Sequence, residues 1–234
     1  MSEKKAKILL VEDEKNVGST LTERLNRENY EVTWSQTKED ALLQLSQRKF
    51  NLFLLDIGLP DGSGFDVAKE CRKTQPSAAV VFLTAFTSPD DRVHGLELGA
   101  EDYIPKPFHL KELILRIQNA LKRAKYVSEA IDDDAPLTIG QASFHFSKFE
   151  ATSGGKIHSL THKEAALLKL LLERKGAVVS RDEILNHVWS EDEFPSSRTV
   201  DNFILRLRRI IEKDPENPQV IKSVRGVGYQ IHVV

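Results

Sequence analysis

The chain lacks long hydrophobic runs, cysteines that could pair with one another and any strong excess of one charge. Its 234 residues contain no apolar stretch near the ~20 residues that a membrane-spanning helix needs, so we expect no membrane insertion. The charged first residues lead into a short apolar run that ends at acidic side chains, which is not the pattern of an export signal. The lone Cys71 cannot form an internal disulfide, so we interpret it as a buried structural thiol in a cytoplasmic protein.

Charge is nearly balanced over the whole chain. With 33 basic and 35 acidic residues the formal net charge is −2, which argues against a protein that binds nucleic acid along its entire length. In the C-terminal part the basic residues are in slight excess and cluster late in the sequence. A hydrophobic content of 40% supports sizeable cores, and a chain of 234 residues favours two domains of ordinary size over one large domain.

The first half of the chain alternates strand-like and helix-like segments. Short apolar runs predict strands at residues 8–11, 31–34, 53–55, 80–83 and 103–105. After each of them, apolar residues at helical spacing predict a helix, the fourth over residues 93–98. This alternation predicts an α/β domain with a doubly wound, five-stranded parallel sheet, which we place at residues 1–124.

Polar residues stand where four of these strands end: Asp56, Glu12 with Asp13, Thr84 and Lys106. Ligands bind beyond the carboxyl ends of parallel strands, so we expect these side chains to gather at one edge of the sheet. Three carboxylates at close range repel one another unless a cation offsets them, and oxygen ligands with room for water suit Mg²⁺. The amine of Lys106 and the hydroxyl of Thr84 suggest a small tetrahedral anion attached to Asp56 or resting against it.

The motifs around these residues resemble a known family. They are Val11-Glu12-Asp13-Glu14, Leu55-Asp56, Pro60-Asp61-Gly62-Ser63-Gly64, Thr84-Ala85 and Lys106-Pro107-Phe108. Each motif is weak alone, but the combination resembles the receiver domain of two-component response regulators. A flavodoxin-like strand order, 2-1-3-4-5, then makes the strand that ends at Glu12 and the strand that ends at Asp56 neighbours.

The resemblance implies a role for each acidic residue at the edge. Asp56 is the expected phosphoacceptor and acts as the nucleophile in phosphoryl transfer. Mg²⁺ is the expected cofactor, held by the side chains of Glu12, Asp13 and Asp56 and by the backbone carbonyl of Gly58.

The same resemblance assigns the remaining polar residues. Lys106 is expected to pair with the phosphoryl group, and the Thr84 hydroxyl is expected to contact it. Thr84 is also part of the switch: once drawn inward it vacates space that Tyr103, the switch aromatic, can fill. The family carries a cis peptide bond between the residues that correspond to Lys106 and Pro107, and we expect one here.

A face of alternating charge is expected on the last helix of the first domain and its neighbour. In the resembled family this face forms a two-fold dimer on activation, and a two-fold contact must be self-complementary, which mixed charge allows. We therefore expect a homodimer on phosphorylation. The expected interface residues are Arg92, Glu97, Asp102, Lys111, Glu112, Arg116 and Arg123.

The organisation of the chain changes after residue 124. Residues 125–136 have little apolar content and include Asp132-Asp133-Asp134, so we interpret them as a flexible linker. Short strands are expected at residues 137–146 and 149–157, with Gly154-Gly155 as a hairpin turn. The alternation of strands and helices therefore does not continue into the second domain.

Two helices and a hairpin have clear local signals in the second domain. Thr161 with Glu164, and Ser180 with Glu183, have the form of a helix-capping box, so each pair predicts a helix start. Residues 224–233 have the glycine-punctuated pattern of a β-hairpin.

The third helix of this domain follows Arg198 and is amphipathic. One face carries Val200, Ile204, Leu207 and Ile211, and the opposite face carries polar residues that can enter a groove. Together with the hairpin and with Leu160-Thr161, Trp189, Arg198-Thr199-Val200-Asp201 and Leu207-Arg208-Arg209, this pattern resembles the winged-helix effector domain of the OmpR/PhoB family.

By this resemblance residues 137–234 form a smaller α+β winged-helix DNA-binding domain, with its recognition helix at residues 198–212. The expected DNA contacts are Arg198, Thr199, Asn202, Arg206, Arg208, Arg209 and, on the wing, Arg225. Leu205 occupies a position that is often polar or basic in the family, so the operator sequence cannot be carried over. Residues 191–197 match a loop that can touch RNA polymerase, and an inert surface loop is an open alternative.

The two resemblances imply a phosphorylation-dependent transcription regulator rather than an enzyme. A sensor histidine kinase would donate a phosphoryl group to Asp56, the receivers would pair, and the winged helices would bind double-stranded promoter DNA. A phosphohydrolase with an aspartate nucleophile is one alternative, but it needs a second aspartate where Gly58 stands. A flavodoxin-like cofactor binder is another, but Glu12 and Asp13 would repel the flavin phosphate.

Overall fold

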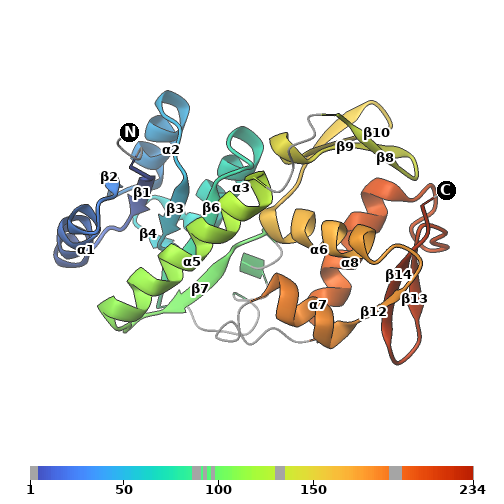
Figure 1. Cartoon of the computed structure of the whole chain (residues 1–234). Coiled ribbons are helices and arrows are strands. Elements are labelled where there is room, and N and C mark those ends of the chain that lie inside the picture. The colour runs from blue at the N-terminus through green and yellow to red at the C-terminus, as the bar shows by residue number, and fades with distance from the viewer. Residues whose placement is uncertain are drawn as a thin grey trace. The chain divides into compact units, whose positions relative to one another are not determined.

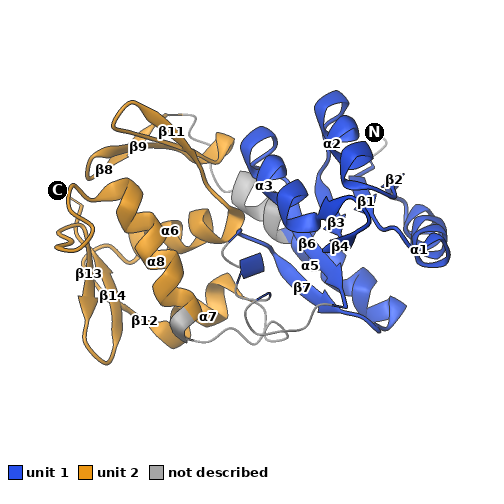
Figure 2. Cartoon of the chain, turned by 180° about the vertical axis from the view of Figure 1, so that it is seen from behind, with its two compact units in different colours: residues 1–125 blue, residues 126–234 orange. Residues whose placement is uncertain are grey.

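The structure is a computed structural model of the chain. It describes residues 5–85, 91, 94–95, 98–129, 135–189 and 197–233, with the backbone alone for residues 123–129 and 197–198. The chain divides into two compact units, residues 1–125 (unit 1) and 126–234 (unit 2), which Figure 2 colours separately. Each unit is described by itself.

Unit 1 is built on a five-stranded sheet in which every neighbouring pair is parallel. Its strands are β1 (Lys7–Val11), β2 (Glu31–Ser35), β3 (Leu52–Leu55), β6 (Ala79–Thr84) and β7 (Asp102–Pro105). They lie in the order β2-β1-β3-β6-β7, which confirms the predicted 2-1-3-4-5 arrangement (Figure 1). This order makes β1 and β3 neighbours, so their carboxyl ends adjoin.

Helices cover both faces of this sheet. They are α1 (Lys15–Arg27), α2 (Lys38–Gln47), α3 (Gly64–Thr74) and α5 (Leu110–Glu129). One apolar core joins the sheet to α2 and α3 and the other joins it to α1 and α5, because the strands are apolar on both sides. The helix expected at residues 93–98 falls largely outside the described residues.

Helix α5 is longer than the sequence indicated. We ended the first domain at residue 124 and expected a flexible linker from residue 125, but α5 continues to Glu129. The first five residues of the expected linker are therefore helical, because this stretch contains no glycine or proline that would break a helix.

A short hairpin follows Asp56 and is anchored to a helix. It consists of β4 (Gly58–Leu59) and β5 (Gly62–Ser63). The carboxylate of Asp61, at its tip, accepts hydrogen bonds from the backbone N–H groups of Lys38 and Glu39 at 2.7 and 2.8 Å. Since the first N–H groups of a helix lack partners within it, Asp61 both caps α2 and fixes the hairpin that contains Gly58.

Unit 2 begins with a four-stranded antiparallel sheet. Its strands are β8 (Leu137–Ile139), β9 (Ala142–His145), β10 (Glu150–Ser153) and β11 (Lys156–Ser159), and a 3₁₀ turn, η1 (Phe146–Lys148), joins the middle pair. The predicted turn at Gly154-Gly155 is confirmed, but the single strand predicted at residues 137–146 is wrong, because the chain reverses at Gly140. Gly140 has φ +58°, and a Cβ there would lie 2.4 Å from the carbonyl oxygen of Ile211.

Three helices and a three-stranded sheet complete unit 2. The helices are α6 (His162–Glu173), α7 (Arg181–Val188) and α8 (Ser197–Ile211), and the strands are β12 (Val178–Ser180), β13 (Ile221–Val224) and β14 (Gly228–Ile231). A single apolar core joins these helices to both sheets. The capping box of Thr161 and Glu164 is confirmed, with both of its reciprocal hydrogen bonds present. An α+β winged-helix domain therefore follows the α/β unit, as predicted.

Across the part of the chain that the structure describes, none of the helices combines the length and apolar character needed to cross a bilayer.

Candidate functional site

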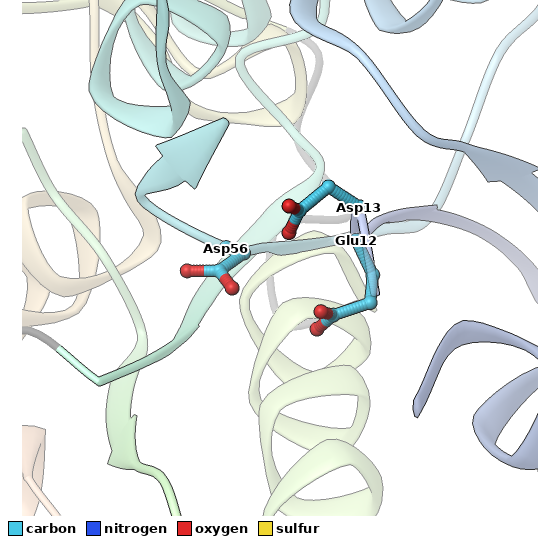
Figure 3. A group of neighbouring side chains, drawn as sticks. All are labelled: Glu12, Asp13 and Asp56. Atoms are coloured by element: carbon cyan, nitrogen blue, oxygen red, sulfur yellow. The ribbon is translucent and has the colours of Figure 1, made fainter. Parts of the chain in front are cut away.

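Three acidic side chains meet at the carboxyl ends of β1 and β3. One oxygen from each of Glu12, Asp13 and Asp56 lies within 4.8 Å of the others (Figure 3). Glu12 and Asp56 are buried, with 0% and 6% exposure, while Asp13 is half-buried. The adjacent register of β1 and β3 brings these residues together although they lie more than forty positions apart in sequence.

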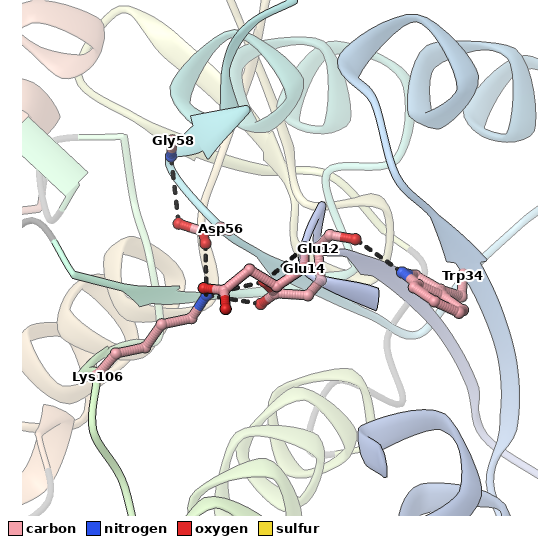
Figure 4. A network of polar contacts seen from close by, with 6 residues as sticks. All are labelled: Glu12, Glu14, Trp34, Asp56, Gly58 and Lys106. Carbon is pink, nitrogen blue, oxygen red and sulfur yellow. Dashed lines mark hydrogen bonds and ion pairs between the residues drawn. The ribbon is translucent and has the colours of Figure 1, made fainter. Parts of the chain in front are cut away.

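The amine of Lys106 closes one side of this cluster. Its Nζ lies 2.6 Å from a carboxylate oxygen of Asp56, 2.9 Å from the carboxylate of Glu12 and 3.7 Å from that of Glu14 (Figure 4). Lys106 follows β7, and its backbone N–H donates to the Thr84 carbonyl at 2.8 Å. The peptide bond between Lys106 and Pro107 is cis, as expected.

The electrostatics of the cluster leave negative charge to be offset. Burial raises the pKa of Glu12, the nearby charge of Asp56 acts in the same direction, and Lys106 opposes both. Burial alone would lower the pKa of Lys106, but its hydrogen bonds to Asp56 and Glu12 outweigh that effect and the pKa is raised. The amine is therefore held in its charged form, yet one ammonium faces three carboxylates.

The donor set of this acidic cluster fits a hard divalent cation. The three side chains offer oxygen atoms alone, they lie within reach of one ion, and their combined charge exceeds that of Lys106. Mg²⁺ prefers a small number of carboxylate oxygens and keeps several of its waters, which the half-buried position of Asp13 allows. Glu12, Asp13 and Asp56 are accordingly the residues that could hold Mg²⁺.

The backbone around the cluster is fixed by contacts between strands. The N–H of Asp56 donates to the carbonyl of Val11 at 2.9 Å, and the N–H of Gly58 donates to the Asp56 carboxylate at 3.2 Å. Gly64 packs directly on this loop, since a Cβ there would lie 2.0 Å from the carbonyl oxygen of Asp56. No larger residue can stand at position 64 without displacing the loop that presents Asp56.

The sequence analysis missed Trp34 as part of this site. Its indole nitrogen on β2 donates to the backbone carbonyl of Glu12 at 2.8 Å (Figure 4). The signal available in the sequence was a large, partly polar aromatic in a strand that pairs with β1. Pairing register is needed to see that Trp34 stands beside the acidic loop.

Thr84 and Tyr103 occupy neighbouring strands near this edge. Thr84 ends β6 and is fully buried, and Tyr103 on β7 is 6% exposed. The ring of Tyr103 lies 6.0 Å from that of Phe82, its register partner on β6. The two residues assigned to the switch therefore belong to adjacent strands of one core.

A second candidate surface lies on α8 of unit 2. The residues predicted to pack, Val200, Ile204, Leu207 and Ile211, are all buried, and Phe203 and Ile210 join them. Thr199 is partly exposed at the start of the helix, and Arg198 has a side chain outside the described residues. The face opposite the core carries Asn202, Leu205 and Arg209 at spacings of three and four residues.

The hairpin of β13 and β14 lies next to α8 and is tied to it. It turns at residues 225–227, with Arg225 exposed and Gly226 at φ +74°. The hydroxyl of Tyr229 donates to Asp201 at 2.5 Å, and Arg181 contacts both of them. Burial and the hydrogen bond to Asp201 raise the pKa of Tyr229 to about 12, so its hydroxyl stays protonated and keeps donating.

Comparisons with known proteins identify a family for each of the two units. The model of the response regulator receiver domain matches residues 8–118, and that of the transcriptional regulatory protein C-terminal domain matches residues 155–231. The chain is 36% identical to the sensory transduction protein RegX3 of Mycolicibacterium smegmatis over 224 residues, which span 96% of this chain and 98% of that protein. The chain belongs to the OmpR/PhoB-type response regulators.

Solved structures show the same architecture for this response regulator. A RitR mutant is 27% identical with a TM-score of 0.81, covering 98% of this chain and all of the other. A CheY-like receiver domain protein from Methanospirillum hungatei is 30% identical with a TM-score of 0.51, covering 52% of this chain and 98% of that one. The first likeness extends over both units, and the second is confined to about half of this chain.

The charged residues that we assigned to a dimer face are partly paired within one receiver. The guanidinium of Arg116 lies 2.9 Å from the carboxylates of both Asp102 and Glu112. Lys111 is exposed on the same helix. Arg92 and Glu97 lie outside the described residues, as does the side chain of Arg123.

Two of the arginines that we assigned to DNA have partners inside the effector domain of the response regulator. Arg206 Nε lies 2.8 Å from the carboxylate of Glu164, which is 1% exposed. The guanidinium of Arg208 donates to the carbonyl of Ile221 at 2.9 and 2.7 Å and to the hydroxyl of Ser223 at 3.0 Å. These contacts join α8 to α6 and to the hairpin. The loop at residues 191–197, assigned to RNA polymerase, lies outside the described side chains.

Proposed function

We propose that this response regulator is a two-component transcription factor switched by phosphorylation of Asp56. A sensor histidine kinase is the phosphoryl donor, receiver pairing is the immediate consequence, and promoter DNA is the target. The observation that carries the proposal is the buried carboxylate of Asp56, set within 4.8 Å of two further acids and 2.6 Å from the amine of Lys106. Neighbouring ionisable groups with shifted pKa values, here Glu12 and Lys106, are typical of functional sites.

The chemistry is an attack by a carboxylate on a phosphoryl group. An oxygen of Asp56 forms a bond to phosphorus while the bond between phosphorus and the kinase histidine breaks, and the histidine nitrogen takes up a proton. Such transfers depend mainly on positioning and on offsetting oxygen charge. When bound by Glu12, Asp13, Asp56 and the carbonyl of Gly58, Mg²⁺ supplies part of that positive charge.

Lys106 supplies the remaining positive charge from the protein itself. Its raised pKa keeps the amine charged, and its distance of 2.6 Å from Asp56 places it beside the oxygens of an incoming phosphoryl group. The same amine holds Asp56 and Glu12 in place before the reaction. Lys106 therefore positions the two carboxylates before phosphorylation and offsets the charge of the phosphoryl group after it.

The response to phosphorylation is a rearrangement of neighbouring strands. A phosphoryl group adds about two negative charges and strong acceptor oxygens, which draw the Thr84 hydroxyl toward the site. Tyr103, already buried on the adjacent strand, fills the space that Thr84 vacates. The face of Asp102, Lys111 and Arg116 then pairs with a second receiver.

The output is regulated binding to double-stranded DNA in the cytoplasm. Helix α8 enters the major groove, the β13–β14 hairpin with Arg225 reaches the minor groove, and residues 191–197 contact RNA polymerase. The exposed cations Arg209 and Arg225 support this assignment, since phosphate contacts supply much of the affinity of such proteins. Gly58 stands where an aspartate-based phosphohydrolase needs its second acid, so no enzymatic function is favoured.

The proposal is tested by phosphorylation with a small phosphodonor and Mg²⁺. The wild-type chain should take up acid-labile phosphate, and Asp56→Asn should take up none. Asp66→Asn is a matched control, because Asp66 is an exposed aspartate on α3 outside the acidic cluster. Labelling of Asp56→Asn to the wild-type level would remove Asp56 from the mechanism.

A further inference from the structure

One side chain on the outer face of α8 does not fit a simple phosphate-binding surface. Leu205 is 37% exposed, although six other apolar residues of the helix are buried in the core. It lies between Asn202 and Arg209 on the outer face of the helix. The exposed part of this leucine is apolar surface on the face of α8 that points away from the core, where it is available to a binding partner.

The charged side chains next to Leu205 on α8 contact other parts of unit 2. Arg206 points its guanidinium to the buried carboxylate of Glu164, and Arg208 points its own to the hairpin. Asp201, one turn earlier, is held by Arg181 and Tyr229, so its negative charge is locally offset. Among the side chains that the structure describes, this stripe of the helix therefore presents the amide of Asn202, the apolar side chain of Leu205 and the guanidinium of Arg209.

The surroundings of this face fit a polyanion rather than a protein partner. Arg209 is exposed beside Leu205, and the hairpin that Arg208 ties to α8 adds the exposed cations Lys222 and Arg225. Phosphate groups of DNA are the natural counterpart of such a distribution. In the major groove of DNA, the C5-methyl group of thymine is the apolar feature that distinguishes one base from the others.

We propose that Leu205 is a specificity-determining residue that reads the C5-methyl group of a thymine in the major groove. This inference rests on the proposed function of DNA binding and specifies how the site is read. An apolar contact with a methyl group favours thymine at one position of each half-site. A basic residue at position 205 would instead favour a guanine or a phosphate.

Deoxyuridine gives a direct test, because it differs from thymidine by the C5-methyl group alone. A binding site is first selected from random duplex DNA with the full chain, and each thymine is then replaced singly by deoxyuridine. For the wild type, one replacement in each half-site should weaken binding about fourfold, because the burial of one apolar carbon of this size contributes about 0.8 kcal/mol. Fluorescence anisotropy measures the ratio of the two affinities.

Variants separate base reading from overall affinity. Leu205→Ala should bind the thymine and deoxyuridine sites equally, and its melting temperature should fall far less than that of a variant at a fully buried position such as Leu207→Ala. Arg209→Ala is the matched control: it should weaken binding to both sites while keeping their ratio. A preference for thymine that survives Leu205→Ala would overturn the inference.

The failure of this inference can be told from failure of the proposed function. A wild-type chain that selects a site but is indifferent to deoxyuridine at every position contradicts the role of Leu205 alone. A wild-type chain that selects no DNA sequence contradicts the DNA-binding function, and the role of Leu205 with it.

Discussion

The indole of Trp34 lies against Gly18 while its nitrogen donates a 2.8 Å hydrogen bond to the carbonyl oxygen of Glu12. Gly18 lies on α1 and Trp34 on β2, so the ring fills the space between a helix and the strand beside β1. A Cβ on Gly18 would lie 2.2 Å from the ring, so any larger residue at this position must displace the indole. The orientation of the acidic loop therefore depends on a residue that carries no charge.

Gly18→Ala should destabilise unit 1 although alanine is the better helix former. Displacing the indole is an overpacking change that costs typically ~1–3 kcal/mol, which exceeds the ~1 kcal/mol that alanine gains in a helix. Urea unfolding followed by Trp34 fluorescence in a Trp189→Phe background measures the difference. Ser19→Ala, on the exposed side of α1, is the control and should shift the midpoint little. An unfolding midpoint raised by Gly18→Ala would show that the ring is not held as described.

Glu12→Gln should weaken Mg²⁺ binding at least tenfold, because it removes one of three negative charges that surround the ion site. Isothermal calorimetry with Mg²⁺ gives the dissociation constant directly. Glu14→Gln is the matched control. Glu14 carries the same charge and lies 3.7 Å from Lys106, but it is exposed and is not one of the three clustered acids. Equal losses in the two variants would mean that general charge, rather than the position of Glu12, determines affinity.

Tyr229 should resist ionisation until the pH approaches 12. Because the folded state holds this proton more tightly than the unfolded state, the contribution to stability is complete below pH ~10 and is lost as the pH rises toward 12. Titration by tyrosinate absorbance should show a group that ionises near pH 12 and that Tyr229→Phe removes. Asp201→Asn should let the same group ionise earlier. A group that still ionises near pH 12 in Tyr229→Phe would have to be another tyrosine and would contradict the assignment.

Arg206→Ala and Arg209→Ala should have different consequences. Removal of Arg206 leaves the buried carboxylate of Glu164 without its ion pair, which should lower the free energy of unfolding of unit 2 by about 1–3 kcal/mol. Removal of Arg209 should leave stability unchanged and reduce the slope of DNA affinity against salt by about 1. Chemical denaturation followed by Trp189 fluorescence and salt-dependent binding measure the two effects. The assignment fails if Arg206→Ala changes the salt slope and leaves stability intact.

The sequence predicts the sheet and its acidic edge well because both depend on local patterns. Apolar runs that end at Glu12 and at Asp56 mark buried parallel strands, and the resemblance to receiver domains supplied the strand order that the structure confirms. The capping box at Thr161 is equally local and is confirmed. In each case the residues that carry the signal are close together in the chain.

What the sequence did not predict depends on contacts between distant segments. Trp34 reaches Glu12 across paired strands, and Arg208 reaches Ile221 across the gap between α8 and the hairpin. The arginine positions alone could not show which guanidinium groups the fold uses internally. The turn at Gly140 was missed for the same reason, because the close approach of Ile211 from α8 requires glycine there.

The pairing of Arg116 with Asp102 and Glu112 inside one receiver has a consequence for assembly. If the same groups pair across a dimer, association exchanges one set of partners for another, and the net gain in free energy is small. The monomeric and dimeric states of the receiver would then have similar free energies. Every 1.4 kcal/mol changes the ratio of the two states by about tenfold, so in the function proposed above a small rearrangement around Tyr103 would suffice to favour the dimer.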